Sequence, residues 1–282
     1  MSRLLGSVIK HYVAGPEHPA KVRFVRWLGR HAMPKAGIVA TVYPDVMLWL
    51  NPLDWVEYLL LRDGRHEPLI LDFLRANLRP AETAILAGVN NGLHAIVAAK
   101  AVGAAGRIIG CEPQPAALLR ARLNLDLNGV PEACVRLVAA AVGAERGLSQ
   151  VPWPPPDNRG AASMFNAGAG FTAPLVPLAE VARGLGLGPV RLLLLDVVGY
   201  EVQALAGLAA LRPDLAVVAV WTEHLTKAGE VPAALYGRLQ EMGYELHDLY
   251  GEPVSQPGEP LPEHNLIGVH AGREVQWNRR RG

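Results

Sequence analysis

A run of four leucines that ends in an acidic residue constrains this chain more than any other feature. Residues 192–195 are all leucine, Asp196 follows them, and a turn at Gly199 leads into a helical stretch. Because the run is apolar on both faces, we expect a central parallel strand covered by helices on each side. Open α/β sheets bind their ligands at the carboxyl ends of such strands. The pattern therefore predicts that Asp196 lies at a ligand site.

Two upstream segments predict strands that end at the same edge. Residues 84–88 lead into Gly88 and Gly92, and residues 107–111 lead into Glu112. The glycines would let backbone approach a ligand, and a helix that begins at residue 93 would present free amide groups. Glu112 follows Gly92 by 20 residues, the separation at which an acidic side chain binds ribose hydroxyls. This predicts a nucleoside site; the alternative is an ordinary turn with a helix-capping Asn and an exposed Glu.

A nicotinamide or flavin dinucleotide is disfavoured by the glycine spacing. Its fingerprint would need glycine at positions 88, 90 and 93. The chain has Asn90 and Leu93 instead. No constellation for hydride transfer is evident either.

The remaining pattern alternates strands with helices. We expect strands at 84–88, 107–111, 134–139, 191–196, 215–221, 244–249 and 265–270. This predicts an α/β fold, a doubly wound and mostly parallel seven-stranded Rossmann-like sheet. Before it lies a helical N-terminal extension, residues 1–66, with a helix capped by Asp54. Residues 67–272 form the main domain, and residues 273–282 form a basic tail.

Taken in order, the motifs resemble those of the FkbM-type methyltransferases, enzymes that use S-adenosylmethionine and have the class I methyltransferase fold. The resemblance runs from about residue 49 to residue 270. Gly64 and Glu67 look like the Gly-x-x-Glu that precedes the family's domain. The other matching residues are Gly88, Asn90 and Gly92; Gly110, Glu112, Pro113 and Pro115; Asn124 and Asn128; Ala141, Val142 and Gly143; Gly160 and Ser163; and Asp196, Gly199, Tyr200 and Glu201.

The resemblance implies methyl transfer from S-adenosylmethionine to an oxygen of a small-molecule or saccharide-type acceptor. It implies that the cofactor is bound by Gly88, Asn90, Gly92, Glu112 and Ala141. It also implies that the final strand pair closes the sheet with an antiparallel member.

Several polar positions of the family are replaced in this chain. Leu86 stands where the family has Asp, Leu194 where it has Lys, and Val198 where it has Glu. Residues 177–179 read Pro-Leu-Ala where the family has Thr-Leu-Asp. These departures leave open a second function, that of a catalytically lapsed protein that serves as a binding or scaffold partner.

Methyl transfer to a hydroxyl requires a group that accepts its proton. Asp196 is the first candidate because it ends a central strand, although it could instead cap the following helix. His224 follows another expected strand and titrates near neutral pH. We expect Glu201 to support the turn rather than to take part in the chemistry.

Composition limits the partners. A net charge of +1 without a sustained basic stripe argues against nucleic acid. The sequence has no membrane span and no secretory signal, so we expect a cytoplasmic protein. Cys111 and Cys134 read as buried core residues, and we expect no metal.

Two segments allow more than one interpretation. Aromatic residues of the N-terminal region could pack on the core, line an acceptor pocket or form the surface of a homo-oligomer. The Pro- and Gly-rich residues 151–171 predict a long loop, which is either a lid or a surface insertion.

Overall fold

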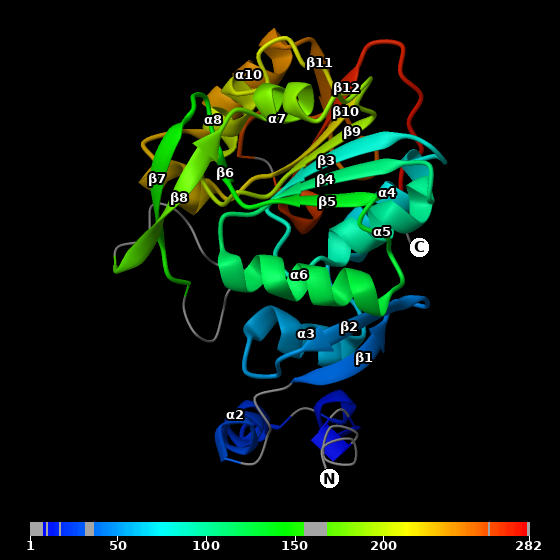
Figure 1. The fold of residues 1–282 in the computed structure, drawn as a ribbon, viewed down its shortest axis with the longest axis vertical. Helices are drawn as coiled ribbons and strands as arrows, with labels where there is room; N and C mark the ends of the chain where they lie inside the picture. The colour runs from blue at the N-terminus through cyan, green and yellow to red at the C-terminus, as the bar shows by residue number, and fades with distance from the viewer. Residues whose placement is uncertain are drawn as a thin grey trace.

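The computed structural model describes residues 8–9, 11–16, 18–31, 37–154, 168–258 and 260–280. A seven-stranded sheet with the order β11-β12-β10-β9-β3-β4-β5 forms its centre (Figure 1). Its strands are β3 (Thr83–Ala87), β4 (Arg107–Cys111), β5 (Val135–Val138), β9 (Leu192–Leu195), β10 (Leu215–Ala219), β11 (Tyr244–His247) and β12 (Asn265–His270). β12 is antiparallel to both of its neighbours, and the other pairs are parallel. All seven expected strands and the antiparallel closure are confirmed.

Helices cover both faces of the sheet (Figure 1). One face packs against α4 (Pro68–Asn77), α5 (Leu93–Val102) and α6 (Pro115–Leu127), and the other against α7 (Leu178–Gly184), α8 (Glu201–Ala206) and α10 (Pro232–Glu241). Successive leucines of β9 enter different cores: Leu194 packs on the α5 side and Leu193 on the α8 side. The four-leucine run thus reflects burial on both faces.

The N-terminal part contains a β-hairpin that we did not expect. Strands β1 (Ile38–Val42) and β2 (Val46–Leu50) pair antiparallel, and α2 (Lys21–His31) and α3 (Trp55–Asp63) flank them in the chain. The cap expected for α3 is confirmed, because the side chain of Asp54 accepts a hydrogen bond from the Glu57 amide at 3.1 Å. Each strand is only five residues long. An alternation of buried and exposed residues over so few positions is a weak signal for a strand.

Asn124 of α6 and the C-cap residue of that helix, Asn128, bind the hairpin. Asn124 Oδ1 accepts a hydrogen bond from the Trp49 amide at 2.7 Å, and Asn128 Oδ1 accepts one from the Met47 amide at 3.0 Å. Asn124 is fully buried and also donates to the carbonyl of Asn91 at 2.8 Å. The family-like Asn-x-x-x-Asn motif is therefore structural here, since its side chains replace the partners that an edge strand lacks.

A second, smaller sheet has the order β6-β8-β7. Its strands are β6 (Ala141–Val142), β7 (Gly147–Pro152) and β8 (Gly170–Val176). The ends of the expected loop at 151–171 therefore belong to paired strands, with Val151 opposite Phe171. Pro152 is compatible with this pairing because β7 is an edge strand. The middle of the expected loop, and with it the lid interpretation, lies outside the described residues.

Both cysteines are buried and free, as expected. Burial raises the pKa of the Cys111 thiol to about 12. Among the described residues, no helix is long and apolar enough to cross a membrane.

Candidate functional site

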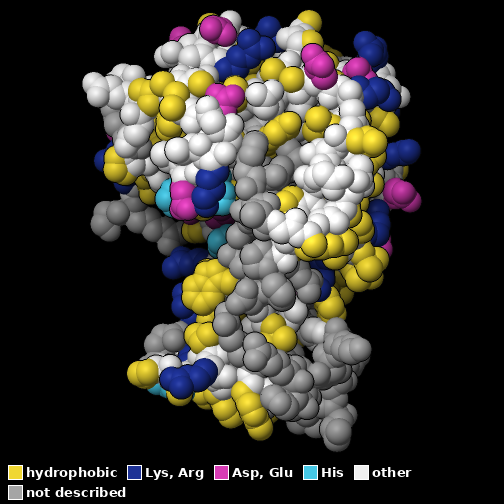
Figure 2. All heavy atoms as spheres, turned by 90° about the vertical axis from the view of Figure 1, so that its left-hand side faces the viewer, with side chains coloured by type: hydrophobic (Ala, Val, Ile, Leu, Met, Phe, Trp, Pro, Cys, Tyr) yellow, Lys and Arg dark blue, Asp and Glu magenta, His cyan; other side chains and the backbone are white. Residues whose placement is uncertain are grey.

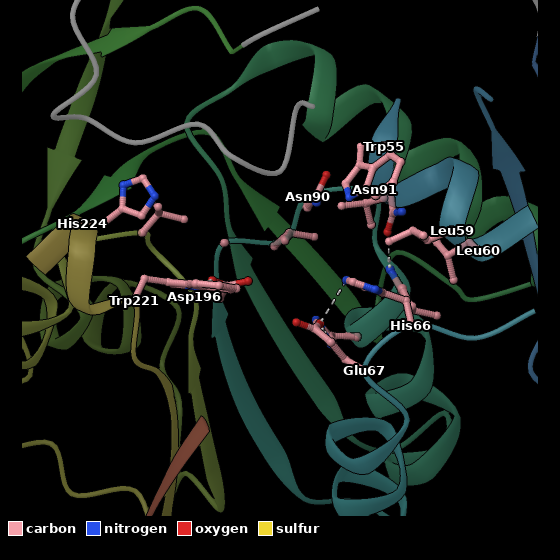
Figure 3. Close-up of a pocket in the computed structure, with 16 residues that line it drawn as sticks. Trp55, Leu59, Leu60, His66, Glu67, Asn90, Asn91, Asp196, Trp221 and His224 are labelled. Atoms are coloured by element: carbon pink, nitrogen blue, oxygen red, sulfur yellow. Dashed lines mark hydrogen bonds and ion pairs between the residues drawn. The ribbon is translucent and has the colours of Figure 1, made fainter. Parts of the chain in front are cut away.

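A cavity of about 330 Å³ lies at the carboxyl ends of β3, β9 and β10. Its lining comes from α3, from the segment before α4, from the β3–α5 turn, from the turn after β9, and from the start of α9 (Thr222–Lys227). In Figure 3, Asp196, Trp221 and His224 lie on one side of the cavity, and Glu67, His66 and the α3 residues lie on the other. The N-terminal part therefore supplies one wall of the site.

The β3–α5 turn brings the ends of β3, β4 and β9 together. Gly88 has φ +87°, and a Cβ there would lie 1.9 Å from the carbonyl oxygen of Asp196. A side chain at this position is therefore excluded by the protein's own backbone. Gly88 also lines the cavity, and its predicted part in cofactor binding stays a prediction. Asn90 lines the cavity and has a left-handed backbone with φ 50°. Its backbone amide donates a hydrogen bond to Glu112 Oε2 at 3.1 Å.

Glu112 is held by backbone amides rather than exposed. Its Oε1 accepts a hydrogen bond from the Gln114 amide at 3.0 Å, and its side chain does not line the cavity. Burial raises the pKa of Glu112 and outweighs the amide hydrogen bonds, which lower it. A carboxylate offers about four lone pairs, so further hydrogen bonds remain open to it. Its role at a ribose stays a prediction.

Gly92 and Ala141 are not among the residues that line the cavity, although the chain neighbours of Gly92 are. Gly92 precedes α5 with φ +90°, and a Cβ there would approach Ala121 of α6 at 3.1 Å. Ala141 is buried in β6, where it pairs with Leu175. Their predicted part in cofactor binding stays a prediction.

Asp196 points into the cavity (Figure 3). Its Oδ1 accepts a hydrogen bond from Trp221 Nε1 at 3.3 Å. Burial and the charge of Glu67 raise the pKa of Asp196 to about 6, although His94 and the Trp221 hydrogen bond lower it. Asp196 does not cap α8, whose N-cap is Tyr200 without a side-chain hydrogen bond.

The turn after Asp196 is stabilised by Glu201, as expected. Both carboxylate oxygens of Glu201 accept hydrogen bonds from the Gly199 amide, at 3.1 and 2.9 Å. Burial raises the pKa of Glu201 to about 7. This carboxylate therefore shapes the loop that carries Asp196.

Sequence reasoning missed a pair of charged groups on the opposite wall. Glu67 Oε2 lies 3.3 Å from His94 Nε2 and 3.8 Å from His66 Nε2. Burial would raise the pKa of Glu67, but the adjacent histidines hold it below its usual range. Burial would likewise lower the pKa of His94, and Glu67 outweighs that effect and raises it. His94 Nε2 makes no well-aligned hydrogen bond, so the contact is chiefly electrostatic.

The sequence contained a signal for Glu67 but none for its contact with His94. Glu67 belongs to the Gly-x-x-Glu segment, which the sequence marked only as the start of a domain. His94 follows Gly92 by two residues in the first turn of α5. Nothing in their separation along the chain indicates contact, because the packing of α4 on α5 brings them together.

His224 lies at the start of α9 and lines the cavity. Its Nδ1 is buried and has no hydrogen-bond partner among the described residues. Burial and the charge of Lys227 lower the pKa of His224, which keeps the imidazole neutral and able to accept a proton near pH 7.

The replaced family positions fall into two environments. Leu86 and Leu194 are paired neighbours in β3 and β9, and both belong to the buried core. Val198 lines the cavity and has φ 43°. A left-handed backbone is an outlier for a β-branched residue, and such strain gathers at functional sites. No group of His, Cys, Asp and Glu within the described ranges could hold a metal ion.

Several solved structures are similar to this chain. One is a putative rRNA methylase from Clostridium thermocellum, with 13% identity, a TM-score of 0.44, and coverage of 71% of this chain and 92% of that chain. Another is fibrillarin from Aeropyrum pernix with bound S-adenosyl-L-methionine, with 15% identity, a TM-score of 0.43, and coverage of 71% and 73%. A putative O-methyltransferase from Klebsiella pneumoniae has 15% identity, a TM-score of 0.41, and coverage of 96% and 100%. No curated protein matches the chain.

The family model of the methyltransferase FkbM domain matches residues 87–246, more than half of the 282 residues. The match begins at the last residue of β3 and ends within β11, so it includes Asn90, Glu112, Asp196 and His224. The chain therefore belongs to the FkbM methyltransferase family.

Proposed function

We propose that the protein is an S-adenosylmethionine-dependent methyltransferase that methylates an oxygen of a small-molecule or saccharide-type acceptor. The observation that carries this proposal is a cavity at three strand ends in which two carboxylates have opposite pKa shifts. The adjacent histidines hold the pKa of Glu67 below its usual range, whereas burial and the charge of Glu67 raise the pKa of Asp196 to about 6. Such separation is typical of sites in which one acid supplies charge and the other exchanges a proton.

The residues of the cavity fit the proposed cofactor. S-adenosylmethionine carries two positively charged groups, a sulfonium and an ammonium, and one negatively charged carboxylate, so its net charge is positive. The described lining contains the carboxylates of Glu67 and Asp196, three histidines, and neither Lys nor Arg. The two carboxylates attract a cationic ligand, although His94, whose pKa is raised, offsets part of the charge of Glu67. Gly88 and Asn90 would hold the cofactor directly, and Glu112 would hold its ribose. When bound, the cofactor supplies an electrophilic methyl group.

We infer that Glu67 takes the place of the family aspartate that Leu86 replaces. Leu86 is fully buried in the core and does not line the cavity, so its side chain is not available to a ligand. Glu67 presents a partly buried carboxylate to that cavity from the wall opposite Asp196, and the adjacent histidines hold its pKa below the usual range. It is therefore suited to bind the ammonium group of the cofactor.

Calorimetry tests this role without reference to activity. Glu67→Gln should weaken the binding of S-adenosylhomocysteine by about tenfold or more, the usual size for a hydrogen bond to a charged group. It should leave the binding of methylthioadenosine, which lacks the amino acid part, unchanged. Glu132→Gln, an exposed carboxylate elsewhere, serves as the control. Equal losses for both ligands would contradict the assignment to the ammonium group.

Asp196 is the proposed general base. Trp221 donates a hydrogen bond to Asp196 Oδ1, which leaves Asp196 Oδ2 to accept the proton of an acceptor hydroxyl. A pKa of about 6 makes it a stronger base than an ordinary carboxylate while it remains ionised at neutral pH. His224, with its unpartnered Nδ1, is the second candidate for this role.

Transfer of a labelled methyl group to a panel of hydroxyl compounds tests the activity. Asp196→Asn should abolish most of the transfer and keep cofactor binding, whereas His224→Gln should change it little. The reverse result would assign the base to His224. Binding of the cofactor without transfer to any oxygen acceptor would contradict the proposed reaction.

The alternative is a catalytically lapsed methyltransferase-fold protein that acts as a binding or scaffold partner. A specific observation favours it: Val198 lines the cavity where the family has Glu, which removes a charged group from the site. Measured affinity for S-adenosylmethionine, together with absent turnover, would support this second function.

A further inference from the structure

The N-terminal segment has a charge that sets it apart from the rest of the chain. Residues 1–36 contain seven Lys or Arg residues and one acidic residue, Glu17, a net charge of +6 in a chain whose total is +1. The remainder is therefore acidic, with a net charge of −5. This asymmetry is hidden by the overall composition, and a segment of this charge is suited to a negatively charged partner.

Helix α2 has a buried face and an aromatic outer face. Val25 is buried at 1% exposure, whereas Phe24 is 42% and Trp27 is 54% exposed. Arg23 is also exposed, and its spacing from Trp27 places both on one side of the helix. The rings of Phe24 and Trp27 stack with their centroids 6.1 Å apart. Hydrophobic and basic side chains lie next to each other on the N-terminal part at the bottom of Figure 2.

We propose that this aromatic and basic face of α2 binds the surface of an anionic lipid membrane. An interfacial helix carries Trp and Phe on its apolar side with Lys and Arg beside them, and it lies in the plane of the headgroups. The exposed rings of α2 would enter the boundary between headgroups and acyl chains. The positive charge of the segment would attract anionic lipids, a contribution that falls with ionic strength.

A second copy of the chain fits this face less well. Two such segments would bring together a large excess of positive charge, and the single acidic residue at position 17 offers little to compensate it. Duplex nucleic acid would match the charge, but its bases are stacked on each other and would leave the exposed rings of Phe24 and Trp27 without a partner. The membrane surface accounts for both the rings and the charge.

Flotation of the full-length protein with lipid vesicles tests the proposal. We expect binding to vesicles that contain phosphatidylglycerol and much weaker binding to vesicles of phosphatidylcholine alone. Phe24→Ser combined with Trp27→Ser should weaken binding about tenfold or more. Arg23→Glu should weaken it about fivefold for each unit of charge changed.

Two control variants change similar exposed residues elsewhere. Leu148→Ser removes a side chain that is 75% exposed on β7, and Arg136→Glu reverses an exposed charge on β5. Both should bind vesicles like the wild type, and thermal unfolding shows whether each variant is folded. If the double variant does not fold, Arg23→Glu alone decides the result.

Four results would overturn the proposal. In the first, the wild type fails to bind anionic vesicles. In the second, Arg23→Glu and the folded double variant bind these vesicles as the wild type does. In the third, RNA of random sequence would displace the wild type from the vesicles at low concentration, which would assign the face to nucleic acid. In the fourth, the protein does not bind vesicles and forms a dimer that the α2 variants dissociate, which would assign the face to a second copy of the chain.

Discussion

Replacing Asp196 by Asn should stabilise the protein at about pH 8 while it removes most of the methyl transfer. Burial and the charge of Glu67 raise the pKa of Asp196 from 3.8 to about 6. Each pKa unit corresponds to about 1.4 kcal/mol, so the ionised carboxylate destabilises the fold by at most about 3 kcal/mol. Asn has nearly the same shape, carries no charge and can still accept the hydrogen bond from Trp221.

The sign follows from the linkage of protonation to folding. The pKa of Asp196 is higher in the folded state than in the unfolded state, so folding favours the neutral carboxyl group. Its contribution to stability is present below pH 3.8 and is lost as the pH rises through about 6. The advantage of Asp196→Asn should therefore be full at about pH 8 and fall to about half at about pH 5.

Urea unfolding of the wild type and the variant at both pH values measures this difference. Turnover should fall roughly 10²-fold to 10⁴-fold, the contribution of a positioned base. Asp126→Asn is the matched control, because a hydrogen bond from Arg122 lowers the pKa of Asp126 and the substitution should not stabilise. A stability difference that is absent at about pH 8, or that does not change with pH, would refute the reasoning.

Three further outcomes are expected. Glu112→Ala should weaken S-adenosylmethionine binding by about 1.5 to 3 kcal/mol, and equal affinities in calorimetry would contradict the ribose role. Leu86→Asp should lower the free energy of unfolding by about 3 kcal/mol or more without tighter cofactor binding, because it places an unpaired charge in the core; a stable variant with tighter binding would contradict the assignment to Glu67. Asn124→Ala should lower the free energy of unfolding by about 1 to 3 kcal/mol, with faster amide exchange at Trp49, and unchanged exchange would mean that the hairpin does not depend on Asn124.

Burial periodicity and residue order were enough to predict the sheet. A strand that is apolar on both faces must be covered on both faces, and strands separated by helices must run parallel. Because the carboxyl ends of parallel strands share one edge, the sequence also predicted that Asn90, Asp196 and His224 lie at a common site. The cavity lining contains all three.

Only the tertiary structure decided which side chains meet. The pairing of Glu67 with His94 depends on how two helices pack, and the β1–β2 hairpin is fixed by asparagines of a helix more than 70 residues away. The same packing hides Leu86 in the core and brings Gly88 against the backbone of Asp196. Sequence patterns report whether a residue is buried and which way a strand runs. Distances between side chains, and the pKa shifts that follow from them, depend on packing that no single segment encodes.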